Sequence, residues 1–184
     1  MNLHVTTPFR IDRNLGKAYN DTFRLIGDDD WLCITDYDVL FLLPDTINNL
    51  YGYIERYPEA DMFVSWANRT FHSNQQLYGG PVATSFHIPH DDVISNQIKI
   101  ARETQRDLYK VTRIQRTISG FLMVIPKRTW NEIKFVEDLK CLGVDSVFSQ
   151  RMVDAGKTIY RMDGVYVWHT YRLENGVKDK SHLE

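Results

Sequence analysis

Two aspartates separated by one residue, Asp36 and Asp38, give the strongest chemical signal in the sequence. They directly follow the apolar run WLCIT at residues 31–35, which is typical of a strand covered on both faces. In an open α/β sheet, ligands bind beyond the carboxyl ends of the strands. Alternate residues of an extended chain lie on the same side, about 6.5 Å apart, so the two carboxylates could hold a divalent cation and a second ligand. Such hard oxygen donors suit Mg²⁺ or Mn²⁺, although paired aspartates are also common as ordinary turn residues.

Two residues much further along the chain could join this acidic pair. His169 follows the strand-like run VYVW, where an imidazole could complete the coordination of a metal, and the alternative is a capping or surface histidine. Asp145 comes just after Gly143 at the start of an expected helix. A carboxylate there is either a helix N-cap or a general base that faces a cleft, and the sequence leaves both interpretations open.

Hydrophobic periodicity predicts the elements that must bring these residues together. Strands are expected at residues 3–7, 31–35, 61–66, 111–118, 121–125, 158–162 and 165–168, and helices at 15–26, 47–54, 94–108, 128–133 and 144–155. The first strand is expected to be buried. The alternation of strands and helices predicts an α/β fold with a mostly parallel sheet flanked by helices and right-handed crossovers. Residues 67–92 show no periodicity, and this long connection is expected near the active site.

Composition narrows the classes of function. The length of 184 residues fits a single domain, expected at residues 1–182, with residues 183–184 as the remnant of a tag. Basic residues (22) nearly balance acidic ones (24), so no global field attracts nucleic acid. The apolar runs are far shorter than the ~20 residues of a membrane span, and the N-terminus shows no secretory signal, so we expect a cytoplasmic protein. Cys33 and Cys141 are too few for a disulfide framework or a cysteine-rich zinc site.

An ordered set of six motifs resembles one known family. The motifs are, in chain order, TTPF at 6–9, NLGKAYN at 14–20, DYD at 36–38, SGFLMV at 119–124, GVD at 143–145 followed by Arg151, and VWH at 167–169. In this order they resemble the GT-A nucleotide-sugar glycosyltransferases, closest to family 2, and they cover most of the chain. One unit of the family is missing: a helix, a second strand and an acidic turn usually stand where only residues 10–13 are found here. The chain therefore resembles a minimal, truncated member.

The resemblance implies a donor site and its cation. It places the following residues around the nucleotide sugar: Thr6, Thr7, Pro8 and Phe9 at the base and ribose, Gly16, Lys17 and Asn20 beside the nucleotide, Asp36 and Asp38 at the ribose and the metal-bound diphosphate, and Gly120 close to the donor sugar. His169 would join the metal shell. The cation would be Mn²⁺ or Mg²⁺, and the donor a UDP- or GDP-sugar. The missing acidic turn often contacts the base, so Asp12 or Arg10 would have to substitute for it.

The resemblance also implies a reaction. The expected activity is that of a hexosyltransferase, which transfers a sugar from a nucleoside diphosphate to a hydroxyl of a glycan, lipid-linked or protein acceptor. Asp145 would act as the base of an inverting mechanism. A retaining GT-A transferase, which needs no base at Asp145, is the nearest alternative, and a non-catalytic module that binds nucleotide sugars or glycans is another. A sugar nucleotidyltransferase ranks last because no glycine-rich triphosphate loop lies near the first strand.

Overall fold

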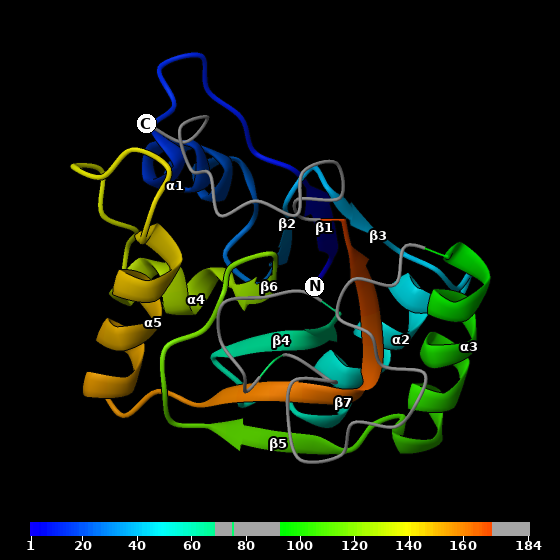
Figure 1. The fold of residues 1–184 in the computed structure, drawn as a ribbon. Coiled ribbons are helices and arrows are strands. Elements are labelled where there is room, and N and C mark those ends of the chain that lie inside the picture. Colours follow the sequence, from blue (N-terminus) through cyan, green and yellow to red (C-terminus); the bar gives the residue numbers. More distant parts are fainter. Residues whose placement is uncertain (69–74, 76–92, 171–184) are drawn as a thin grey trace.

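Seven strands form one sheet in the computed structural model of the chain, which describes residues 1–68, 75 and 93–170 (Figure 1). The strands are β1 (Leu3–Thr6), β2 (Trp31–Thr35), β3 (Val39–Leu40), β4 (Met62–Ala67), β5 (Val111–Ile114), β6 (Leu122–Pro126) and β7 (Ile159–His169). Their order across the sheet is β1-β2-β6-β4-β7-β3, and β5 pairs with the first part of β7. The strands that carry the acidic pair and the late histidine thus belong to one sheet.

Helices cover the sheet on both sides (Figure 1). They are α1 (Leu15–Leu25), α2 (Thr46–Arg56), α3 (Ile94–Thr104), α4 (Lys127–Glu132) and α5 (Val144–Asp154), with a 3₁₀ turn, η1 (Gln105–Asp107), after α3. Helices α1, α4 and α5 lie on one side, and α2 and α3 on the other. The described residues therefore form a single α/β domain, as the alternating pattern predicts. None of its helices is long and apolar enough to cross a membrane.

The sheet is mixed, and the expectation of a mostly parallel sheet is wrong. Strands β1, β2, β4 and β7 run in one direction, but β6 lies between β2 and β4 and is antiparallel to both. Strands β3 and β5 are antiparallel to β7. The chain enters β6 at the edge of the sheet where β2 ends, and this reverses its direction. Local periodicity identifies a strand but carries no information on its direction.

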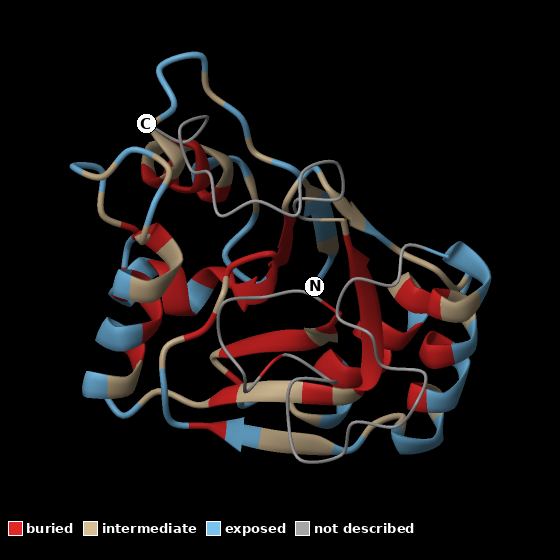
Figure 2. Cartoon of the chain, viewed as in Figure 1, coloured by how far each residue is buried: buried red, intermediate tan, exposed pale blue. Residues whose placement is uncertain are grey.

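Two apolar layers form because neighbouring residues of a strand point to opposite faces. Leu32 and Ile34 of β2 pack with α1, α4 and α5, whereas Trp31 and Cys33 pack with α2. Strands β2 and β6 are buried along their whole length (Figure 2). A rigid, doubly covered centre of this kind fixes the backbone up to Thr35, immediately before the acidic pair.

Three details differ from the predicted elements. Strand β1 is the edge of the sheet and half exposed, so its expected burial is wrong. The two strands expected at 158–168 are one continuous strand, β7, and the short strand β3 was not predicted. Residues 69–74 and 76–92 of the expected long connection lie outside the described residues.

Both ends of α1 are capped by side chains. At the N-terminus the Asn14 side chain accepts a hydrogen bond from the Lys17 amide at 2.8 Å. At the C-terminus the buried ammonium of Lys127 donates to the carbonyls of Phe23 and Ile26, which have no partner within the helix. A positive charge there also complements the helix dipole. These caps fix the helix that follows β1.

Replacing Lys127 tests this C-terminal cap. Lys127→Met should lower the free energy of unfolding by about 2 kcal/mol, because it removes hydrogen bonds from a charged donor and leaves buried carbonyls unpaired. Urea denaturation measures the change. The matched control is Lys134→Met, at an exposed lysine that lies 5.0 Å above the Trp130 ring and should cost less than about 0.5 kcal/mol. Equal losses in the two variants would contradict a capping role for Lys127.

Candidate functional site

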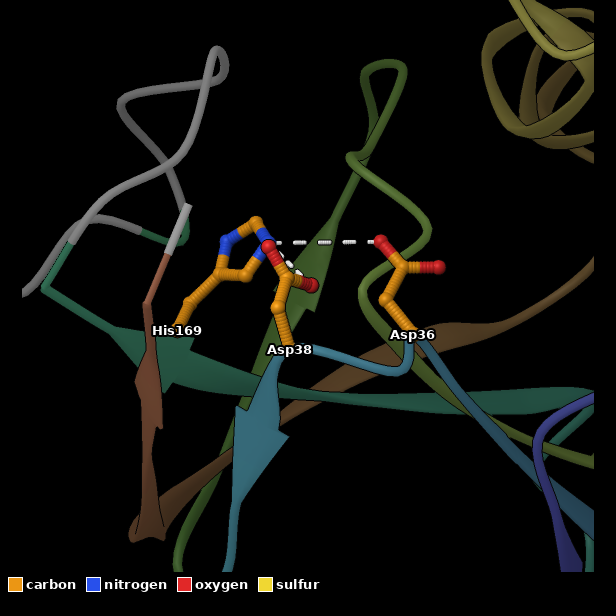
Figure 3. Close-up of side chains that lie close together, drawn as sticks. All are labelled: Asp36, Asp38 and His169. Carbon is orange, nitrogen blue, oxygen red and sulfur yellow. Dashed lines mark ion pairs between the residues drawn. The ribbon is translucent and has the colours of Figure 1, made fainter. Parts of the chain in front are cut away.

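The pairing of β3 with the end of β7 brings Asp38 next to His169. Val39 lies opposite His169 in this antiparallel pair, and the Asp38 carbonyl accepts hydrogen bonds from the Thr170 amide at 2.8 Å and from the Thr170 hydroxyl at 3.0 Å. As a result, Nε2 of His169 lies 3.3 Å from Oδ1 of Asp38 (Figure 3). Two residues from opposite ends of the sequence thus form one backbone-paired unit.

Asp36 approaches the same imidazole from a second direction. Its backbone N–H donates to the Phe121 carbonyl at 3.0 Å, and its Oδ2 lies 4.0 Å from Nε2 of His169. The Phe121 ring stacks on the His169 ring, with 5.2 Å between the centroids. Phe121 therefore contacts both Asp36 and His169, and Figure 3 shows the two carboxylates facing the same ring nitrogen of His169.

The three side chains fit a divalent cation. One ligand atom from each of Asp36, Asp38 and His169 can be chosen so that all lie within 4.8 Å of one another. Two carboxylate oxygens and one imidazole nitrogen form a donor set that suits Mn²⁺ or Mg²⁺ and leaves room for further oxygen ligands. His169 is buried, so its orientation is fixed by packing. We call these three residues the Asp-Asp-His cluster.

The electrostatics of Asp36 are those of a carboxylate partly withdrawn from water. Its pKa lies at about 6, above the ordinary value of 3.8. Burial is the main cause; the imidazole of His169 opposes the shift, and the negative charges of Asp38 and Asp145 add to it. A bound cation would relieve this unfavourable concentration of negative charge.

Asp145 and Gly120 lie beside the cluster and contact each other. The Asp145 Oδ2 accepts a hydrogen bond from the Gly120 amide at 2.6 Å, and Oδ1 accepts one from the Ser146 amide at 2.8 Å. A Cβ atom on Gly120 would come within 2.7 Å of the Asp145 Cβ, so this position requires glycine. The charges of Asp36 and Asp145 both contribute to the raised pKa of buried Tyr19, although burial is the larger cause. The expected base Asp145 and Asp36 therefore both lie within electrostatic range of Tyr19 and of each other.

The expected nucleotide segment at residues 6–9 lies next to Asp36. Thr6 pairs with Ile34, and the Thr7 hydroxyl is 3.0 Å from that of Thr35, directly before Asp36. Phe9 is 80% exposed, so its ring is available to a ligand at this edge of the sheet. The parallel pairing of β1 with β2 places this segment and the Asp-Asp-His cluster side by side.

Asn20, which was expected beside the nucleotide, has other partners. The buried Asn20 amide accepts hydrogen bonds from Trp130 and Phe135 and donates to Phe135 and Glu137, which uses all of its polar capacity. A nucleotide contact of Asn20 does not fit these bonds.

Gly16 and Lys17 also belong to the packing of α1. A Cβ atom on Gly16 would lie 1.8 Å from the Val136 carbonyl oxygen, so glycine is needed for the close approach of α1 to this segment. Lys17 is partly exposed. A hydrogen bond from Arg10 is the main reason that the pKa of Asp12 is lowered, and the charge of Lys17 adds to this effect. The contacts of Gly16 and Lys17 described here are therefore made with nearby segments of the same chain. The side chain of Lys17 remains partly exposed at the surface.

Sequence reasoning missed two residues that contact the cluster, Phe121 and Asn68, and a third, Gln75, that binds the backbone of Ser119 nearby. Phe121 stands in an apolar run, which by itself indicates only a core residue. Asn68 follows a buried strand, as Asp36 does, and its side-chain oxygen accepts the His169 amide at 2.9 Å, so the same rule could have found it. Gln75 lies in a segment without periodicity, and nothing in its local sequence marks it.

A separate cavity of about 370 Å³ lies between β4, β7 and the end of α3. Its lining includes Trp66, Arg161 and Asp163 but no member of the Asp-Asp-His cluster. The Arg161 guanidinium lies 3.4 Å from the centroid of the Trp66 ring and covers that face of it. This cavity is therefore distinct from the cluster.

Comparison with known proteins does not identify the chain. No protein-family model matches it, and no curated protein matches it either. The function must therefore be argued from the site itself.

The raised pKa of Asp36 makes a prediction about stability and pH. The pKa is higher in the folded protein than in the unfolded chain, so ionisation of Asp36 destabilises the fold. The cost begins as the pH rises past about 4, where the unfolded chain ionises, and is complete above about 6. Asp36→Asn removes this cost of ionisation. In the presence of a chelator, the Tm of the variant relative to that of the wild type should therefore rise between pH 4 and 7 and remain raised at higher pH.

Asp30 provides a control of opposite sign. A hydrogen bond from His4 is the main reason that its pKa falls to about 2. Asp30→Asn should therefore be less stable than the wild type above pH 4, with a deficit that shrinks as the pH falls towards 2. A Tm difference between Asp36→Asn and the wild type that does not vary with pH would contradict the raised pKa of Asp36.

Proposed function

We propose that the protein is a metal-dependent glycosyltransferase of the GT-A type, which transfers a sugar from a nucleoside diphosphate to an acceptor hydroxyl. The observation that carries the proposal is the convergence of Asp36, Asp38 and His169 at one edge of the sheet, next to residues 6–9. The same residues are those to which the resemblance of the ordered motifs would assign the donor and its cation. The mixed sheet with helices on both sides is compatible with that fold.

In this proposal, five residues of the chain bind the cation and the nucleotide-sugar donor. Asp36, Asp38 and His169 would hold the cation, and Thr7 and Phe9 would contact the ribose and base of a UDP- or GDP-sugar. When bound, the cation would act as a Lewis acid that stabilises negative charge on the leaving diphosphate. The buried His169 and the backbone bonds of Asp38 hold two of the three ligands in place before a cation arrives.

Asp145 is the candidate base for an inverting transfer. A carboxylate has about four acceptor positions, and the Gly120 and Ser146 amides use two of them. The remaining lone pairs could accept the proton of the acceptor hydroxyl, a role typically worth ~10² to 10⁴ in rate. The hydrogen bond from Gly120 would keep this carboxylate oriented beside the donor sugar.

One observation favours the retaining alternative. Both oxygens of Asp145 bind backbone amides, as expected of a residue that only joins α5 to the segment before β6. In that case the metal and donor site would be the same, but no base would be needed at Asp145. The anomeric configuration of the product separates the two mechanisms.

A panel of nucleotide sugars tests the proposal most broadly. The purified protein is incubated with UDP- and GDP-sugars in Mn²⁺, Mg²⁺ or chelator, and thermal shift and release of nucleoside diphosphate are measured. We expect one class of donor to raise Tm only with the metal, because a ligand of the native state stabilises it. Metal-dependent donor binding without hydrolysis or transfer to glycan, lipid-linked or protein acceptors would instead indicate a binding module.

Asp38→Asn tests the metal site itself. The loss of one charged ligand should weaken Mn²⁺ binding at least tenfold, because Asp38 contacts the imidazole most closely and its backbone is fixed by Thr170. Titration calorimetry measures the affinity. Asp45→Asn is the control, since Asp45 is exposed and its side chain makes no capping bond to α2. Unchanged Mn²⁺ affinity in Asp38→Asn would rule out the Asp-Asp-His cluster as the metal site.

Asp145→Asn tests the base. It should lower the transfer rate at least 100-fold, while the Kd of the donor changes less than about threefold, because the amide cannot take up a proton. Asp154→Asn, at the exposed other end of α5, removes the same charge and should leave both quantities unchanged. Normal turnover in Asp145→Asn would remove Asp145 from the base role and favour the retaining mechanism.

A further inference from the structure

Gln75 is a fully buried glutamine whose side chain binds the backbone of Ser119 twice. Its Oε1 accepts the Ser119 amide at 2.6 Å, and its Nε2 donates to the Ser119 carbonyl at 3.0 Å. The backbone carbonyl of Gln75 in turn accepts the Ala67 amide at 2.9 Å, at the end of β4. Gln75 therefore connects the end of β4 to the segment before β6.

These two segments hold different members of the Asp-Asp-His cluster. At the end of β4, Ala67 pairs with Val167 of β7, and the side chain of Asn68 accepts the His169 amide. On the other side, Ser119 lies two residues before Phe121, whose carbonyl accepts the Asp36 amide. Backbone bonds join Asp38 to the end of β7 and so to His169. Asp36 is joined to Phe121 through its amide, and its carbonyl accepts a longer bond, at 3.3 Å, from the Val39 amide.

The segment before β6 is also fixed from the side of α5. The amides of Ile118 and Gly120 donate to the side chains of Ser149 and Asp145, on either side of the bonds between Ser119 and Gln75. The bonds to α5 fix this segment against that helix. Strands β4 and β6 pair at Phe63 with Val124 and at Val64 with Met123. The bonds of Gln75 connect the two segments beyond this pairing, at Ala67 and Ser119. Buried hydrogen bonds in such a network resist displacement because an unpaired polar group in the core is costly.

We infer that Gln75 is a positioning residue for the metal site: together with the backbone pairing of β4 and β6, its amide sets the position of Asp36 relative to Asp38 and His169. This inference rests on the proposed function, since it assumes that the Asp-Asp-His cluster holds a divalent cation. Gln75 lies outside the Asp-Asp-His cluster, and none of its hydrogen bonds described above is made to a side chain of the cluster. The measurable consequence is a change in the affinity for the metal alone, without donor or acceptor.

Gln75→Met tests the inference. Methionine fills a similar volume but can neither accept the Ser119 amide nor donate to its carbonyl. Metal-free protein is titrated with MnCl₂, and unbound Mn²⁺ is measured by electron paramagnetic resonance. We expect the Kd of Mn²⁺ to rise about tenfold in Gln75→Met, together with some loss of stability to urea.

The matched control is Gln97→Met, the same substitution at a second buried glutamine. Gln97 lies in α3, and its side chain accepts a hydrogen bond from the hydroxyl of Tyr166, which belongs to a separate core cluster with Ile100 and Ala101. It should lose stability but keep the Kd of Mn²⁺ within twofold, so the comparison separates positioning from general destabilisation. If Gln75→Met does not fold, Gln75→Glu, which keeps the acceptor and loses the donor, is compared with Gln97→Glu in the same way.

The outcomes for Gln75 and for the metal site are distinguishable. If the wild type binds Mn²⁺ and the Gln75 variant binds it equally well despite its lower stability, Gln75 is structural only and the inference is overturned while the proposed function stands. If the wild type itself does not bind Mn²⁺, the proposed function falls and the inference falls with it.

Discussion

The backbone pairing of β3 with the end of β7 is the constraint on which the whole site depends. Strand β3 has two residues, yet it places Val39 opposite His169 and so fixes Asp38 beside the imidazole. The buried strands β2 and β4 end on the same side of the sheet, where the residues that follow them, Asp36 and Asn68, lie next to His169. A short edge pairing is sufficient because both partners emerge from a rigid core.

The candidate site also shows a balance between stability and function. The packing that orients Asp36 also raises its pKa to about 6, so the folded protein tolerates a carboxylate that is costly to ionise there. Nothing in the requirements of folding calls for acidic groups so near one another. Such local conflicts are expected where a protein binds a ligand of opposite charge, because the ligand restores the balance.

Much of this arrangement could be predicted from the sequence, and the remainder depends on long-range contacts. The periodicity of α1 with its Asn14 cap, and the apolar run of β2 followed by two aspartates, are local patterns, and the structure has both elements where they were expected. The antiparallel insertion of β6 and the existence of β3 were missed because strand direction and a two-residue pairing leave no local pattern. Asn20 lies in a motif that predicts ligand contact, yet its partners lie within residues 130–137. Only tertiary structure shows where a polar side chain finds its hydrogen bonds.

The most direct test of the central claim is to locate a bound cation. Crystals are grown with MnCl₂ and a nucleoside diphosphate, and anomalous diffraction is recorded at the manganese absorption edge. We expect an anomalous peak in contact with the Asp38 carboxylate and Nε2 of His169, with the diphosphate beside it. A peak elsewhere on the protein, or no peak at saturating manganese, would contradict the claim that the Asp-Asp-His cluster is a metal centre.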